Sequence, residues 1–145
     1  MENASETTKT VGKKIINEAT AQKDVERWLD YKRVGSRKRE DNSAAIEGIV
    51  SAIMDGDMVV SNEGHEIKHI LRFPIGNNDA VKELNYKARL SIKERNKKLK
   101  GIKATDTNEY LVALIAALAD QNKAVIEELD TEDNNIAQNV ALFFI

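Results

Sequence analysis

The chain has 145 residues, of which 41% are hydrophobic and 32% charged, and its formal net charge is −2. This length suits one domain with a single core. Cysteine is absent, which excludes disulfides, thiolate zinc sites and a cysteine nucleophile and favours a reducing compartment. The longest apolar stretch, residues 110–119, is about half as long as a membrane span, so we expect a soluble protein with no membrane partner.

Residues 1–20 are predicted to form a flexible N-terminal tail. The segment is polar, has no secretory signal, and its apolar residues Val11, Ile15 and Ile16 are too few to anchor a packed element. The remaining residues, 21–145, are predicted to form one α+β domain. Its predicted parts are a helical arm (21–55), a sheet (57–90) and a helical part (91–145).

Two helices are predicted in the helical arm. The first covers residues 21–32 and carries one face at helical spacing, formed by Val25, Trp28, Leu29 and Lys32. The second is capped by Asn42 or Ser43 and carries an apolar stripe as far as residue 55. Gly56 then supplies the left-handed residue that ends it.

A small three-stranded antiparallel meander is predicted over residues 57–90, because the hydrophobic period changes there to two. The first strand begins at Met58, and Pro74 is predicted to end the second because proline lacks a backbone donor. The third strand ends near Leu90. The predicted inward face of the second strand carries Ile67, His69, Leu71 and Phe73.

The C-terminal part is predicted to be a helical subdomain. Ser91 and Glu94 form a capping-box pattern that starts a short basic helix. The helix over residues 107–120 is apolar nearly all round, so it should be the most buried element. Thr131 is predicted to cap the last helix. The apolar residues after it either complete the core or leave one side chain, Phe144, as an anchor for a partner.

Charge is distributed unevenly along the chain, which is basic over residues 87–103 and acidic over residues 104–145. A basic face of this kind could dock an acidic protein segment or contact phosphates. Nucleic acid is the less favoured partner, because aromatic residues are few in the basic run and the pI is near 5.8. The residues predicted to bind a partner are Lys87, Arg89, Lys93, Arg95, Lys97, Lys98 and Phe144.

No residue pattern indicates an enzyme, a metal site or a cofactor site. The two histidines, His65 and His69, are too few for a spaced zinc pattern and are interpreted as structural or surface residues. There is no Gly-x-Ser-x-Gly elbow and no phosphate-binding glycine loop. Two pairs of carboxylates lie near predicted helix ends and are interpreted as helix caps, namely Asp55 with Asp57 and Asp130 with Asp133. We therefore expect a protein that binds another protein and catalyses nothing.

Several short segments in the second half of the chain follow one another in a characteristic order. They are Leu71-Arg72-Phe73-Pro74-Ile75, Glu83-Leu84-Asn85-Tyr86-Lys87-Ala88-Arg89, Leu114-Ile115-Ala116-Ala117-Leu118, Val125-Ile126-Glu127-Glu128-Leu129-Asp130 with Asp133, and Val140-Ala141-Leu142-Phe143-Phe144. Over residues 71–145, about half of the chain, this order resembles the tail assembly chaperones of long-tailed bacteriophages, particularly the Mu-like family.

The resemblance implies a small non-enzymatic protein without a cofactor that binds the tape-measure and tail-tube subunits in the host cell cytoplasm. Residues 21–55 are not part of the family pattern. They could form an added partner-binding arm, or they could indicate a structural virion subunit of the neck, capsid or baseplate. A weak nucleic-acid-binding protein that uses residues 87–103 is a further alternative.

Overall fold

The computed structural model describes residues 16–103 and 105–145. It confirms the predicted α+β class, with helices packed on a three-stranded antiparallel sheet of order β1-β2-β3. The N-terminal helices are α2 (Glu18–Lys32), α3 (Ser36–Asp41) and α4 (Ser43–Met54), and the strands are β1 (Met58–Val60), β2 (Glu66–Ile75) and β3 (Val81–Lys87). The C-terminal helices are α5 (Ile92–Leu99), α6 (Thr107–Ala119), α7 (Lys123–Glu127) and α8 (Thr131–Ala141). Short 3-10 turns, η1 (Asn77–Asp79) and η2 (Leu142–Phe144), follow β2 and α8.

Helix α2 begins three residues earlier than predicted, because the side chain of Asn17 accepts a hydrogen bond from the N–H of Thr20 and caps it. The end of the predicted tail is therefore the first helical turn, while residues 1–15 lie outside the described residues. The predicted buried face of α2 is observed, and Trp28 at its centre is fully buried. The short helix α3 was not predicted.

Strand β2 continues past Pro74 to Ile75, so the prediction that Pro74 ends it is wrong. The pairing of β2 with β3 is regular from Glu66 to Ile70 and resumes only at Ile75. Because Pro74 lies inside this irregular stretch, its missing N–H does not interrupt a regular ladder. The predicted alternation of buried and exposed side chains holds as far as Leu71.

Phe73 is an exception on the predicted inward face, because its side chain is 52% exposed. It lies in the irregular part of β2, where the strict alternation of side chains between the two faces is lost. The prediction that Phe73 belongs to the buried face is therefore wrong.

Helix α6 is the element with the longest continuous run of buried residues, from Ala113 to Leu118, in agreement with its all-round apolar sequence. The capping box of Ser91 and Glu94 at the start of α5 is also observed. The last helix is capped by Asp130, whose side chain accepts the N–H of Glu132. The prediction that Thr131 caps it is therefore wrong, because Thr131 is already the first residue of the helix.

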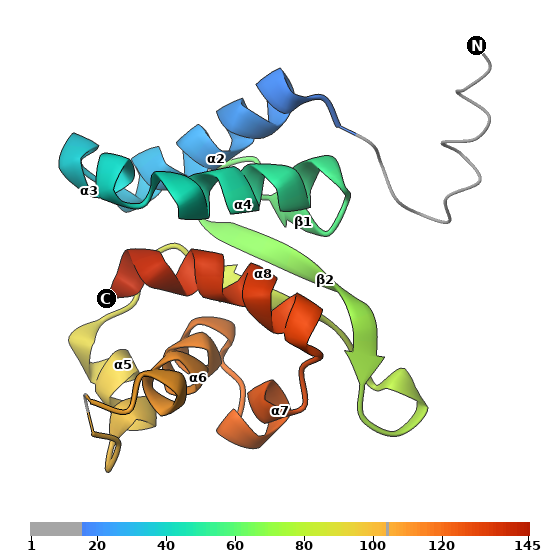
Figure 1. Cartoon of the computed structure of the whole chain (residues 1–145), viewed down its shortest axis with the longest axis vertical. Coiled ribbons are helices and arrows are strands. Elements are labelled where there is room, and N and C mark those ends of the chain that lie inside the picture. The colour runs from blue at the N-terminus through green and yellow to red at the C-terminus, as the bar shows by residue number, and fades with distance from the viewer. Residues whose placement is uncertain (1–15, 104) are drawn as a thin grey trace.

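Helix α8 lies against β2 and between α4 and α6, so it joins the two groups of helices (Figure 1). Figure 1 shows α2, α3 and α4 on one side of β2 and α5 to α8 on the other. Residues 21–55 share the core with the rest of the chain and do not extend away as a separate arm. The indole of Trp28 meets the ring of the fully buried Phe143 edge to face, with 5.6 Å between centroids.

Candidate functional site

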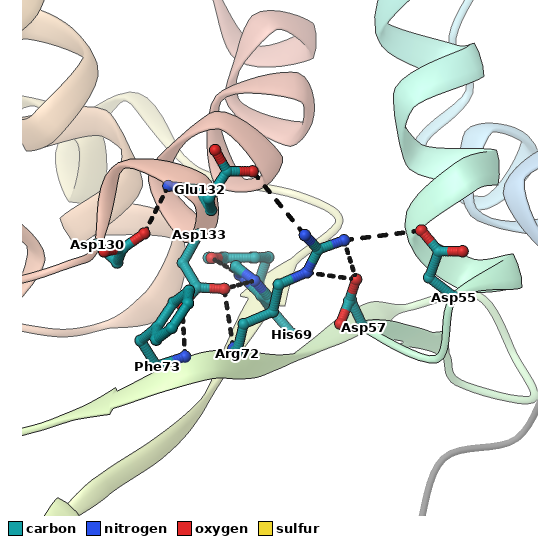
Figure 2. A network of polar contacts seen from close by, with 9 residues as sticks. Asp55, Asp57, His69, Arg72, Phe73, Asp130, Glu132 and Asp133 are labelled. Atoms are coloured by element: carbon teal, nitrogen blue, oxygen red, sulfur yellow. Dashed lines mark hydrogen bonds and ion pairs between the residues drawn. The ribbon is translucent and has the colours of Figure 1, made fainter. Parts of the chain in front are cut away.

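The carboxylate of Asp133, in the first turn of α8, points at β2 (Figure 2). It accepts hydrogen bonds from the backbone N–H groups of Arg72 and Phe73, each at 3.0 Å. Both donors lie where β2 and β3 lose their regular pairing, so Asp133 satisfies groups in the irregular stretch of the sheet. Asp130 is a helix cap as predicted, whereas the interpretation of Asp133 as a cap is wrong, because its side chain is fully buried against the sheet.

His69 and Tyr86 extend this contact into the core. The Nδ1 atom of His69 lies 2.7 Å from the hydroxyl oxygen of Tyr86, and its Nε2 atom lies 3.3 Å from Oδ1 of Asp133. A neutral imidazole protonated on Nε2 fits both neighbours, because Tyr86 can then donate to Nδ1 while the Nε2–H faces the carboxylate. Tyr86, His69 and Asp133 are all fully buried.

Burial and the surrounding charges set the pKa values in this network. Burial raises the pKa of Tyr86 well above its ordinary value, and the negative charge of Asp133 adds to the effect. Burial alone would raise the pKa of Asp133 as well. However, hydrogen bonds from His69 and from the N–H groups of Arg72 and Phe73 outweigh burial and lower that pKa. The three side chains therefore hold α8 on the sheet, and the burial of His69 agrees with its interpretation as structural.

The side chain of Arg72 makes a second connection between distant elements (Figure 2). Its Nε and Nη2 atoms donate to Oδ2 of Asp57 at 2.9 and 2.7 Å. Asp55 lies 3.6 Å from the guanidinium and Glu132 of α8 lies 3.8 Å from it. The hydrogen bond with Asp57, together with these negative charges, raises the pKa of Arg72 despite its partial burial. The side chain of Asp57 is fully buried and bonds Arg72, so the interpretation of this carboxylate as a helix cap is wrong, although the backbone N–H of Asp57 donates to the oxygen of Ala52 at the end of α4.

The residues predicted to bind a partner have different surroundings. Lys87 donates to Glu94 at 2.7 Å, and this bond, with those from Ser91, lowers the pKa of Glu94 to about 2. On α5, Lys93 and Lys97 are exposed. Lys98 and Arg95 are half-buried, and Nε of Arg95 is buried without a hydrogen-bond partner among the described residues.

Arg89 and Phe144, in contrast, meet residues from the N-terminal helices. Arg89 donates to the backbone oxygen of Tyr31 at 2.8 Å, and its guanidinium carbon lies 4.7 Å from the centroid of the Tyr31 ring. The Nζ atom of Lys32 lies 3.5 Å from the centroid of the Phe144 ring. The pKa of Lys32 is lowered to about 8. Burial is the largest cause, and the positive charges of Lys38 and Arg89 contribute the rest.

We call this surface the basic corner and define it by the cations Lys32, Lys38 and Arg89 with the rings of Tyr31 and Phe144. In Figure 1, α3 and the C-terminus lie on the same edge of the molecule, and the contact between Lys32 and Phe144 joins the end of α2 to the last residues of the chain. One feature of the sequence pointed to this surface, because Lys32 stands on the predicted buried face of α2. Its contact with Phe144 could not be predicted, because the two residues are far apart along the chain.

Comparisons with models of protein families, with curated proteins and with solved structures found no match to this chain. Within residues 16–103 and 105–145, no group of three or more His, Cys, Asp or Glu side chains is arranged to hold a metal ion. None of the helices in the described part of the chain is long and apolar enough to cross a membrane.

Proposed function

We propose that this chain is a non-enzymatic assembly chaperone of a long-tailed bacteriophage, which binds the tape-measure or tail-tube protein in the host cytoplasm. The observation that carries the proposal is the contact between Asp133 and the backbone of Arg72 and Phe73. These residues belong to the last and the first parts of the segment that resembles the Mu-like chaperones.

The rest of that segment supports the same interpretation. Its two strand segments lie on the neighbouring strands β2 and β3, and its helical segments lie on α6, α7 and α8. Helix α6 packs on β3, and α8 packs on both β2 and α6. The residues that carry the resemblance therefore form one contiguous unit, which is what a family pattern rooted in a common fold requires.

The proposal is tested by co-expressing the affinity-tagged chain with the tape-measure protein and, separately, with the tail-tube protein from the same genome. We expect one of the two to be retained on the affinity column at physiological salt. The major capsid protein, expressed in the same way, is the control and should not be retained. Retention of neither protein would contradict the proposal.

A structural virion subunit is the second candidate. It is favoured by residues 21–55, which lie outside the resemblance and yet contribute Trp28, Ile49 and Ile53 to the core. Quantitative mass spectrometry of purified virions separates the two functions. A chaperone should be absent or far below one copy per tail, whereas a structural subunit should be present at a fixed stoichiometry.

A further inference from the structure

The basic corner holds three positively charged side chains. Among the residues that the structure describes, none of Lys32, Lys38 and Arg89 forms an ion pair with a carboxylate. Two cations close to them in the sequence do have such partners, since Arg39 lies 2.9 Å from Asp30 and Lys87 lies 2.7 Å from Glu94. The three cations come from α2, α3 and the connection between β3 and α5. Arg89 reaches the end of α2 through its hydrogen bond to Tyr31, the residue before Lys32. Arg39 connects α3, which carries Lys38, to Asp30 of α2.

The charges of Lys38 and Arg89 make the charged form of Lys32 less favourable. The Lys32 ammonium rests on the face of the Phe144 ring, with Nζ 3.5 Å from the ring centroid. Lys38 and Arg89 repel it, and this repulsion adds to burial in lowering the pKa of Lys32. A carboxylate placed among the three cations would offset this repulsion, which is the smaller part of the effect on Lys32.

Apolar surface lies beside the charges. The side chain of Tyr31 is 37% exposed and that of Ile145, which follows Phe144, is 63% exposed. Arg89 lies over the Tyr31 ring and Lys32 over the Phe144 ring, so each aromatic ring already has a cation on one face. The surface therefore offers both charged and apolar contacts to a protein segment. It does not offer neighbouring free ring faces on which nucleic-acid bases could stack.

We infer that the basic corner docks an acidic segment of a partner protein, whose carboxylates pair with Lys32, Lys38 and Arg89 while an adjacent apolar side chain packs on Tyr31. Three convergent cations suit a compact carboxylate cluster better than an extended row of phosphates, and the chain as a whole is negatively charged. The inference rests on the proposed function only where it takes the partner to be a tail protein.

Fluorescence anisotropy with a labelled peptide, in which Glu residues flank Leu, tests the inference directly. The same peptide with Gln at every Glu position should not bind, and the affinity for the Glu peptide should fall as salt is added. The double variant Lys38→Glu with Arg89→Glu should bind at least about tenfold more weakly. The single variant Lys38→Glu, which keeps the bond of Arg89 to Tyr31, should show a smaller loss in the same direction. Circular dichroism melting verifies that each variant is folded.

The matched control is Lys82→Glu with Lys123→Glu, which makes the same change in net charge on β3 and α7, two elements that contribute no residue to the basic corner. It should bind the peptide nearly as well as the unmodified chain. Equal loss in the control, equal binding of the Gln peptide, or no binding of the Glu peptide would overturn the inference. Tighter binding of a single-stranded DNA oligonucleotide than of the Glu peptide at physiological salt would also overturn it and favour a nucleic-acid partner.

The two proposals fail in different ways. If the unmodified chain retains a tail protein and the Lys38→Glu, Arg89→Glu variant retains it equally, the docking surface is wrong and the chaperone function stands. If the unmodified chain retains neither tail protein but binds the Glu peptide through the basic corner, the chaperone function is wrong and the docking surface stands.

Discussion

Asp133 and Arg72 lie 61 positions apart in the sequence, yet the carboxylate of Asp133 accepts the backbone N–H of Arg72 at 3.0 Å. The same carboxylate accepts the N–H of Phe73, so one side chain attaches α8 to the irregular part of β2. The carboxylate of Asp133 therefore accepts two backbone N–H groups in the stretch where β2 and β3 are not regularly paired.

Replacing Asp133 by Ala should destabilise the fold by about 2–4 kcal/mol, because two backbone donors lose their acceptor at a site where the side chain is fully buried. Urea unfolding at neutral pH measures the loss. The matched control is Asp130→Ala, which removes only the cap of the same helix and should cost about 1 kcal/mol. Equal losses from the two substitutions would contradict the role assigned to Asp133.

The same carboxylate should make the fold sensitive to acid. The folded state holds the pKa of Asp133 below its ordinary value of 3.8, so the unfolded chain binds the proton first as the pH falls. The stabilisation is therefore complete above the ordinary pKa and is lost as the pH falls through the lowered value. Urea unfolding across this range should show a steeper loss of stability for the unmodified chain than for Asp133→Asn. Parallel curves would contradict the prediction.

Phe143 and Phe144 are neighbours in sequence but should respond differently to truncation. Phe143 is fully buried against Trp28, so Phe143→Ala should cost about 3–5 kcal/mol. Phe144 is half-buried under Lys32, and Phe144→Ala should cost about 1–2 kcal/mol because less area is lost from the interior. Chemical denaturation of both variants provides the comparison, and losses of equal size would show that both rings are core residues.

Lys32 should titrate near pH 8 in the folded chain, which NMR of its side-chain ammonium group can follow. The folded state loses this proton before the unfolded state does, so the stability should rise with pH between about 8 and 10.5. Arg89→Gln and Lys38→Gln should each raise the pKa of Lys32 part of the way toward 10.5, because burial is the larger cause and remains. An unchanged pKa in both variants would mean that the two cations do not act on Lys32.

Gly64 and Gly101 both have positive φ, of 82° and 81°, but their surroundings differ. A Cβ on Gly64 would meet the backbone oxygen of Arg27, whereas a Cβ on Gly101 would meet open space. Gly101→Ala should therefore cost only the backbone strain, about 1–2 kcal/mol, and Gly64→Ala should cost clearly more. Thermal unfolding of the two variants compares strain alone with strain plus a backbone clash, and equal shifts in melting temperature would contradict this reading.

The amino-acid sequence by itself determined the features of the fold that depend on neighbours along the chain. The helical spacing in α2 and α4, the alternation in β2, and the capping box at Ser91 and Glu94 were all predicted and are observed. Each of these patterns reflects side chains a few positions apart that share one face of an element or one helix end. The burial of α6 followed in the same way, since a helix that is apolar all round has no face to expose.

The tertiary structure alone decided which polar side chains work together. Asp57 and Asp133 each stand near a helix end, where the local pattern is explained by capping. Lys32 stands on the predicted buried face of α2, where the local pattern names no partner for its charge. Their actual partners are Arg72, the backbone of β2 and the ring of Phe144, which come from distant parts of the chain. Such contacts depend on how the helices pack on the sheet, and packing is set by the shape of the whole core and not by any local pattern of residues.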